Sequence, residues 1–348
     1  MTTLPFATPE LPGSGGALRA TPEDFRVDEV PAYLPAGTGP HLYLRIEKRG
    51  RTTRDALRTL AAALGVPDRD AGYAGQKDKD AVTTQWLSFP VAKDPDPAQL
   101  AAPGLTVLEV SRHQNKLRTG HVRANRFGVV VRGGDLARAE ACAAALSARG
   151  LPNFYGPQRF GVEGNNAAIG RALVRGERTP EAGRAARDRF LRRLSISAFQ
   201  SHLFNRWLSA RMADGLFATA IEGEVLKKLD TGGLFNCADP AVDGPRVARF
   251  EVSPAGPMFG HKLRPATGPA LAREEAILAA DGIALSDFAR GGGEAEGTRR
   301  PARLPIAIAL SAVPDGYLAA FELPRGGYAT VVMRELMKSE AELPDEEE

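Results

Sequence analysis

Gly75-Gln76-Lys77-Asp78-Lys79-Asp80-Ala81-Val82-Thr83-Thr84-Gln85 is the stretch of this sequence that says most about its fold. The first half is a charged turn, and the second half opens the segment Val82–Phe89, whose β-branched and aromatic residues predict a strand. Upstream, Thr52 and Asp55 have the spacing of a capping box, which predicts the start of a helix. The sequence therefore predicts a helix, a charged turn and a strand in succession.

The segments on either side of this turn predict a mixture of helices and strands. The helix after Thr52 should end at Gly65 and Pro67, and its apolar face is marked by Ala56, Leu57, Leu60, Ala61 and Leu64. Strands are predicted over Phe25–Val30, His41–Ile46, Leu105–Val110 and Phe127–Val131. A further helix is predicted over about Leu136–Arg149, between Asp135 and Gly150. This half of the chain is predicted to be α+β.

The second half of the chain has a different pattern of predicted elements. Helical stretches are predicted over Thr179–Arg193 and Ala198–Asp214, and glycine-punctuated short strands follow them. The run 291–297 interrupts all periodicity and predicts a flexible loop. Beyond it, Ile306–Leu310, Tyr317–Leu323 and Ala329–Val332 are predicted strands that would pair with the early ones. Both a middle insertion and two sequential domains fit this order.

The composition excludes several classes of protein. Of the 348 residues, 43% are hydrophobic and 25% are charged, as in ordinary globular chains of one or two domains. No apolar run is long enough to span a membrane, and residues 1–16 lack the order of a secretion signal, so we expect a cytoplasmic protein. Two isolated cysteines and five scattered histidines predict no disulfide and no metal site. Because no glycine-rich nucleotide motif occurs, we expect no ATP or NAD cofactor.

The distribution of charge suggests a polyanionic partner. The whole chain has a net charge of +3, but six acidic residues follow Lys338, so residues 1–338 hold 45 basic and 36 acidic residues, or +9. Six bases and no acid lie between Arg112 and Arg132, and five bases and one acid lie between Arg45 and Arg54. Such local excess favours contacts with nucleic-acid phosphates, although a solvated charged surface is the plainer interpretation.

The charged turn is a candidate catalytic site, since an enzyme without a metal or cofactor must use its own acids and bases. Lys77 and Lys79 flank Asp78, so they should keep its carboxylate anionic and offer ammonium groups to a phosphate backbone. Glycines at 72 and 75 would let the chain approach a ligand closely. Most charged turns are merely solvated, and on composition alone Asp80 is as plausible a carboxylate as Asp78.

Three other clusters combine amides, aromatics and bases. In Asn125-Arg126-Phe127, the amide could read a base edge and the ring could stack on an unpaired base, although alternation with Val129 and Val131 favours a core strand. Gln158-Arg159-Phe160-Gly161 has a similar mixture, and so does the third cluster, Phe199-Gln200-Ser201 with Phe204-Asn205. The fourfold spacing of Phe199, Leu203 and Trp207 predicts a buried helix face.

In this order along the chain, the motifs resemble the TruD family of tRNA pseudouridine synthases. The resemblance runs from residues 24–29 to residues 323–330, and it is strongest at residues 75–85, where the family's catalytic aspartate falls on Asp78. Asn125 and Phe127 match the family's Asn-x-Phe, and residues 158–161 and 256–260 match too. One departure is Ala124, which stands where the family usually has glycine; if that position needs a positive φ, alanine would strain the turn by about 1–2 kcal/mol.

The resemblance implies an architecture and an activity. The fold would be a pseudouridine-synthase catalytic domain, with a central cleft across a mixed, mainly antiparallel sheet, formed by residues 1–154 and 298–348. A family-specific α/β insertion domain would span residues 155–297, which favours the insertion interpretation. The reaction would convert uridine 13 of transfer RNA to pseudouridine without a cofactor. The implied partner is transfer RNA, with no membrane and no protein partner.

The same resemblance implies the roles of individual residues. Asp78 would be the catalytic residue, and the substrate-binding residues would be Phe127, Asn125, Lys77, Lys79, Phe25 and Gln158. Two other classes of protein compete with this interpretation. One is a non-catalytic RNA-binding protein or RNA chaperone in which Asp78 is structural, and the other is an RNA methyltransferase. The absence of a glycine-rich strand-to-helix loop weakens the methyltransferase.

Overall fold

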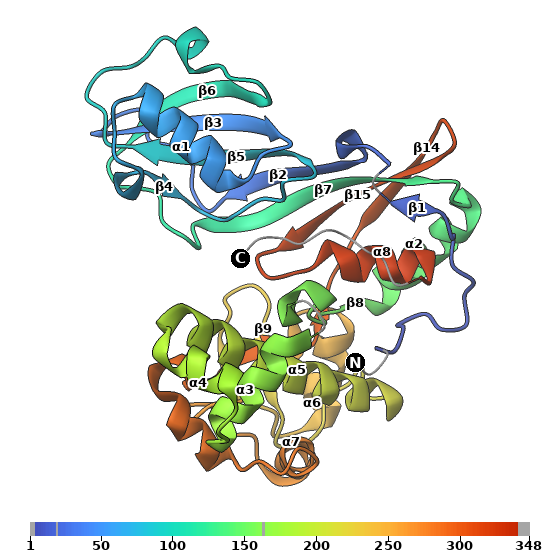
Figure 1. Ribbon diagram of the computed structural model, residues 1–348. Helices are drawn as coiled ribbons and strands as arrows, with labels where there is room; N and C mark the ends of the chain where they lie inside the picture. The colour runs from blue at the N-terminus through green and yellow to red at the C-terminus, as the bar shows by residue number, and fades with distance from the viewer. Residues whose placement is uncertain (1–3, 19, 162–163, 340–348) are drawn as a thin grey trace. The chain divides into compact units, whose positions relative to one another are not determined.

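The strand predicted after the charged turn forms over the predicted residues, as β5 (Val82–Phe89), and all eight of its side chains are buried. The computed structural model describes residues 4–18, 20–161 and 164–339. The other strands around β5 are β1 (Ala17–Leu18), β2 (Phe25–Pro31), β3 (His41–Arg49), β4 (Gly72–Tyr73), β6 (Leu105–His113), β7 (Val122–Arg132), β14 (Ile308–Val313) and β15 (Gly316–Pro324). Together they make one nine-stranded sheet (Figure 1).

The sheet combines strands from the first part of the chain with two strands from its last part. Its strands follow the order β14-β15-β7-β2-β5-β3-β6, with β1 beside β7 and β4 beside β5. Within the described residues, every pairing in this sheet is antiparallel except that of β2 with β5. The predicted α+β class with a mixed, mainly antiparallel sheet is confirmed, as is the pairing of late strands with early ones. The predicted cleft stays a prediction.

Helix α1 (Thr53–Ala63) covers part of this sheet, and its start is the predicted capping box. The Thr52 side chain accepts a hydrogen bond from the Asp55 amide, and the Asp55 carboxylate accepts one from the Thr52 amide. Its apolar face, which includes Leu57 and Leu60, packs on side chains of β3 and β5 such as Leu44 (Figure 1). The helix therefore fixes the position of the turn that follows it.

Helices α2 (Leu136–Arg149) and α8 (Ala329–Met337) complete the regular helices around the sheet. The α2 bounds are those predicted, but the strand predicted over Ala329–Val332 is wrong, because these residues begin α8. Every residue of α8 is buried. A short apolar run that is buried on all sides has no polar face to reveal its period, so helix and strand have the same pattern. The short 3-10 helices here are η1 (Pro22–Asp24), η2 (Asp68–Asp70) and η3 (Pro97–Leu100).

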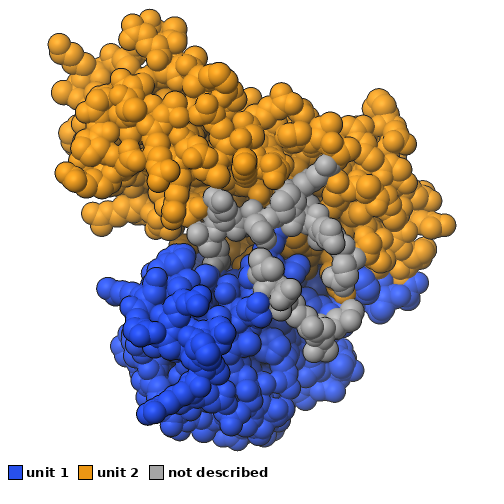
Figure 2. All heavy atoms as spheres, viewed as in Figure 1, with its two compact units in different colours: residues 1–10, 145–305 blue, residues 11–144, 306–348 orange. Residues whose placement is uncertain are grey.

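The chain divides into two compact units, shown in two colours in Figure 2. The sheet unit comprises residues 11–144 and 306–348, and the helix-rich unit comprises residues 1–10 and 145–305. Strand β8 (Leu151–Pro152) pairs with β13 (Arg303–Leu304), so both ends of the middle segment stay with the helix-rich unit. The unit boundaries at 145 and 305 lie outside the predicted insertion limits of 155 and 297, and the insertion domain itself stays a prediction.

The helix-rich unit is built around α5 (Arg189–Ala213), and the predicted face of Phe199, Leu203 and Trp207 is buried. Its other helices are η4 (Pro157–Phe160), α3 (Asn165–Arg175), α4 (Pro180–Arg187), α6 (Pro240–Ala248), α7 (Gly268–Ala279) and η6 (Leu285–Ala295). A four-stranded antiparallel sheet has the order β10-β9-β11-β12. Its strands are β9 (Val225–Lys228), β10 (Leu234–Asn236), β11 (Val252–Met258) and β12 (Thr298–Pro301).

The flexible loop predicted over residues 291–297 is wrong in most of its length. Residues up to Ala295 belong to η6, where Gly292 kinks the backbone at a φ of 61°. Phe288 and Ala295 are buried in one cluster with side chains of α3 and α5. A Cβ on Gly291 would lie 2.4 Å from the Ala295 Cβ, so this glycine permits close packing. In this run, Gly291 therefore permits close packing, and Gly292 permits the kink in the backbone.

The strain expected at Ala124 is also absent. Ala124 lies within β7, where it pairs with Val30 on one side and Pro324 on the other. The described non-glycine residues with positive φ are Phe250, Asp315 and Lys338. An extended backbone accepts alanine, so the departure from the family pattern costs no backbone strain here.

Two further points from the sequence are the acidic residues near the C-terminal end and the expected lack of a membrane-spanning segment. The acidic residues after Lys338 lie outside the described residues. In the described part of the chain, no helix is long and apolar enough to cross a membrane.

Candidate active site

The charged turn between β4 and β5 separates its two aspartates by burial. Asp78 is 4% exposed and Lys77 is 7% exposed, whereas Lys79 and Asp80 are exposed. A carboxylate that is removed from water interacts more strongly with its neighbours than one at the surface. The structure therefore distinguishes Asp78 from Asp80, which composition could not do.

A set of buried hydrogen bonds fixes the shape of this turn. The Thr53 hydroxyl, at the start of α1, accepts from the Lys77 amide at 2.8 Å and donates to the Gln85 Oε1 at 2.8 Å. The Gln85 side chain also donates to the Gly75 carbonyl at 3.1 Å. The fully buried Lys48 donates from its Nζ to the Asp78 carbonyl. The turn is thus held from α1, β3 and β5 at once.

Removing the Thr53 hydroxyl should loosen this turn. Thr53→Val keeps the side-chain shape but leaves the Lys77 amide and the Gln85 Oε1 without their buried partner, so we expect the free energy of unfolding to fall by about 1–3 kcal/mol. Urea denaturation followed by circular dichroism measures this change. Thr106→Val, at an exposed position of β6, is the control and should cost no more than about 0.5 kcal/mol. Equal effects from the two variants would contradict this role of Thr53.

Lys77 has a different neighbour from the one expected. Its Nζ lies 2.9 Å from the Glu29 Oε2, and the two side chains are 6% and 0% exposed. The ammonium group is thus buried against a carboxylate of β2. The predicted contact of Lys77 with a phosphate stays a prediction. Lys79 remains exposed, and its predicted phosphate contact stays a prediction.

Asn125 lies beside this ion pair. It is the cross-strand partner of Glu29 in the β2–β7 pairing, so the two side chains point to the same face of the sheet. The Asn125 Oδ1 is buried and accepts no hydrogen bond from any described residue. A buried polar atom without a partner carries a free-energy cost that a bound ligand can remove. Asn125 therefore has an acceptor available for a substrate, and its predicted role in substrate binding stays a prediction.

Phe127 and Phe25 lie on the same face but inside the core. Phe127 is 3% exposed, and its ring centroid lies 5.3 Å from that of Phe321 and 6.2 Å from that of Phe25, which is 2% exposed. The alternation with Val129 and Val131 thus gives buried side chains, as a core strand requires. The predicted contact of Phe127 and Phe25 with the substrate stays a prediction.

Gln158 belongs to the other unit. It lies on η4 of the helix-rich unit, whereas Asp78, Asn125, Phe127 and Phe25 belong to the sheet unit. The structure thus links the charged turn to the strand position beside Asn125 through the Lys77–Glu29 ion pair. It leaves the predicted role of Gln158 untested.

Sequence reasoning missed three residues of this site, which are Glu29, Lys48 and Thr53. Glu29 had a usable signal, because the alternation of buried Phe25 and Val27 in β2 continues to position 29 and places a carboxylate on the core face. A charged residue at a core position requires a partner. Lys48 shows the same signal in β3, because the alternation of buried Leu44 and Ile46 continues to position 48.

Known proteins resemble this chain over nearly its whole length. The sequence model of one family, described as tRNA pseudouridine synthase D (TruD), matches residues 4–183 and 181–336. The chain belongs to the TruD family. A tRNA pseudouridine synthase D of Anaeromyxobacter dehalogenans (strain 2CP-C) is 79% identical over 347 residues, covering 100% of both chains. One from Thermus thermophilus is 45% identical, covering 97% of this chain and 93% of the relative.

The fold of the TruD family is also found in a solved structure. A crystal structure from Methanosarcina mazei, described as that of a putative tRNA pseudouridine synthase D (TruD), superimposes with a TM-score of 0.77 and covers 96% of each chain. At 24% sequence identity, this likeness shows a shared fold. The family resemblance carried by the motifs at residues 75–85 and 125–127 is confirmed by the family model and the relatives named above.

Proposed function

We propose that this member of the TruD family is an isomerase that converts uridine 13 of transfer RNA to pseudouridine, with Asp78 as its catalytic residue. Supporting this proposal are the relatives named tRNA pseudouridine synthase D and the buried, rigidly held Asp78 in the family's motif. The single observation that carries the assignment of Asp78 is the contrast between this buried carboxylate and the exposed Asp80 two residues on.

The chemistry requires one bond to break and another to form. The N1–C1′ bond of the nucleotide breaks, the uracil turns, and C5 bonds to C1′. The hydrogen on C5 leaves as a proton, and N1 takes up a proton from solvent. Asp78 can serve in two ways: its carboxylate can attack the nucleotide as a nucleophile, or it can remove a ribose proton as a general base. No electrons enter or leave the substrate overall, so carboxylate chemistry suffices.

The other residues of the site suit supporting roles. The base must leave its stack to reach a buried carboxylate, which costs a few kcal/mol. The Asn125 Oδ1, which is buried without a described partner, is suited to accept a hydrogen bond from the uracil N3–H. The buried Glu29–Lys77 ion pair joins the turn to β2. These residues would orient the base and the carboxylate toward each other.

A cofactor-free assay tests this function. The full-length protein is incubated with an unmodified tRNA transcript and buffer alone, and the RNA is digested to nucleosides and separated by chromatography. We expect pseudouridine to appear at one position per transcript. Binding of the transcript without any pseudouridine would instead favour a non-catalytic RNA-binding protein. Modification only after addition of a methyl donor would favour a methyltransferase.

Affinity for transfer RNA should depend strongly on salt. The basic stretches Arg45–Arg54 and Arg112–Arg132 predict phosphate contacts, and each contact releases condensed counterions. We expect the logarithm of the association constant to fall linearly with the logarithm of the salt concentration, by about 0.7–0.9 per phosphate contact. Filter binding between low and physiological salt measures this slope. A flat titration would contradict the predicted phosphate contacts.

A further inference from the structure

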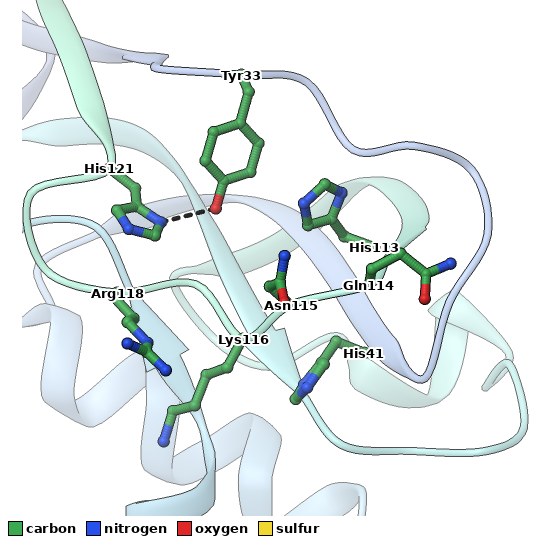
Figure 3. Close-up of a pocket in the computed structure, with 8 residues that line it drawn as sticks. All are labelled: Tyr33, His41, His113, Gln114, Asn115, Lys116, Arg118 and His121. Atoms are coloured by element: carbon green, nitrogen blue, oxygen red, sulfur yellow. Dashed lines mark hydrogen bonds between the residues drawn. The ribbon is translucent and has the colours of Figure 1, made fainter.

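Three of the five histidines of the chain line one pocket in the sheet unit, and Asp78 is not among its lining residues (Figure 3). The pocket has a volume of about 610 Å³. The side chains that matter here are Tyr33, His41, His113, Lys116, Arg118 and His121. They come from the segment after β2, the first residue of β3, the last residue of β6 and the loop 114–121 that leads into β7. Two stretches that are distant in sequence, residues 33–41 and 113–121, thus build one cavity.

The aromatic wall of this pocket is held in place by its own contacts. The Tyr33 hydroxyl lies 2.7 Å from the His121 Nδ1, and the Tyr33 ring stacks on His113 with centroids 4.9 Å apart. The Ala36 amide donates to the His113 Nδ1 at 3.3 Å, so neutral His113 has its proton on Nε2 as a donor. Tyr43 packs edge-on against His113 and donates to the Asn115 carbonyl at 2.9 Å. The wall is therefore preorganised.

Ion pairs show which bases of the stretch Arg112–Arg132 are available to a ligand. Four of the six already pair with carboxylates from elsewhere in the chain, in the pairs Arg112–Asp94, Arg123–Glu322, Arg126–Glu322 and Arg132–Asp24. The other two are Lys116 and Arg118, for which no ion pair with a carboxylate is found in residues 4–18, 20–161 and 164–339. The Lys116 Nζ donates to the Arg69 carbonyl at 2.8 Å, which leaves its positive charge without a neutralising partner among the described residues. The two bases without such a pair are the two that line the pocket.

The remaining groups in the pocket agree with a site for an anion. No aspartate or glutamate lines it among the residues that the structure describes. The His41 Nδ1 is buried and has no hydrogen-bond partner in the described chain. The pKa of His41 is lowered from its usual value, first by burial and then by the charges of Lys116 and His113. The interior of the pocket is thus electropositive and has unfilled hydrogen-bonding capacity.

The pocket is connected to the candidate active site within the same unit. The Gly120 amide in its loop donates to the Ala74 carbonyl at 2.8 Å, and Ala74 begins the turn that holds Asp78. A Cβ on Gly72 would lie 2.2 Å from the Leu117 carbonyl, so the loop packs directly on this segment. The loop then continues into β7 and Asn125. A strand of RNA at Asp78 could therefore reach the pocket with a neighbouring part of its backbone.

We propose that this pocket binds a backbone phosphate of the transfer RNA substrate outside the reacting nucleotide, through Lys116 and Arg118. The histidine ring nitrogens add uncharged donors to the two cations, and the Tyr33–His113 stack fixes the geometry. This inference rests on the proposed function, because it takes transfer RNA as the substrate.

The test compares variants of the full chain in binding to an unmodified tRNA transcript over a range of salt. The pocket variant is Lys116→Gln/Arg118→Gln, and the control is Arg58→Gln/Arg138→Gln, which removes two exposed bases that pair with Asp68 and Asp135. Both variants lose two positive charges. We expect the pocket variant to bind about tenfold more weakly with a salt slope smaller by about one, whereas the control changes binding less than twofold.

Two further arms separate folding and ligand source. Arg118→Gln alone changes an exposed side chain and should weaken binding by part of the tenfold loss with an unchanged melting temperature. Inorganic phosphate is titrated at constant ionic strength while the histidine ring protons are followed by NMR. Equal salt slopes for the pocket and control variants would overturn the proposal, as would histidine shifts with free phosphate when RNA binding is unaltered. If the wild type binds transfer RNA as expected but forms no pseudouridine, the proposed function fails and the pocket result stands separately.

Discussion

Asp78→Asn should abolish pseudouridine formation, lowering turnover by at least about 10³-fold, while leaving tRNA binding and the melting temperature near those of the wild type. Asparagine has the shape of aspartate but neither attacks the nucleotide nor accepts a ribose proton. The contact that holds this residue from Lys48 is to its backbone carbonyl, which the substitution keeps. Chromatography of digested tRNA measures turnover, and thermal unfolding measures the fold.

Asp80→Asn is the matched control for this prediction, because it makes the same chemical change two residues away on an exposed side chain. We expect its turnover to stay within about threefold of the wild type, since exposed substitutions outside a site have small effects. An active Asp78→Asn together with an inactive Asp80→Asn would move the catalytic role to Asp80.

Phe127→Ala should lower the free energy of unfolding by about 3–5 kcal/mol, because it removes a buried ring from between Phe25 and Phe321. A ring that also stacks on the substrate should give a second effect, a loss of about 1–3 kcal/mol in substrate or transition-state binding. Measuring the melting temperature and the turnover at low temperature on one sample separates the two contributions.

Phe190→Ala is the control, since Phe190 is 59% exposed and the same ring is deleted from the surface. It should change stability by no more than about 0.5 kcal/mol. A Phe127→Ala protein that is as stable as this control would contradict the core position of the ring. A destabilised Phe127→Ala protein with normal turnover in the cold would contradict the stacking role.

The local structure near the charged turn could be predicted from sequence because its signals are local. The capping box at Thr52, the strand Val82–Phe89 and the helix Leu136–Arg149 formed where they were expected. Each depends on side chains within a few residues of one another. The family was also predictable, since the motif around Asp78 is contiguous.

The features that could not be predicted depend on partners distant in sequence. The ion pair of Lys77 with Glu29 was not predicted, because Glu29 belongs to a strand and lies 48 positions earlier in the sequence. The stretch Arg112–Arg132 has no acid of its own, and its charges are compensated by Glu322, Asp94 and Asp24. Helix α8 is buried on all sides, so its residues have the same pattern as a strand. Only the assembled sheet shows these relationships.

Release of hydrogen from C5 under single-turnover conditions tests the central claim most directly. A tRNA transcript tritiated at C5 of its uridines is mixed with excess protein and buffer alone, for the wild type, Asp78→Asn and Asp80→Asn side by side. The buried carboxylate of Asp78 predicts release of tritium equal to one uridine per transcript by the wild type and Asp80→Asn, and none by Asp78→Asn. Tritium release by Asp78→Asn at the wild-type rate would contradict it.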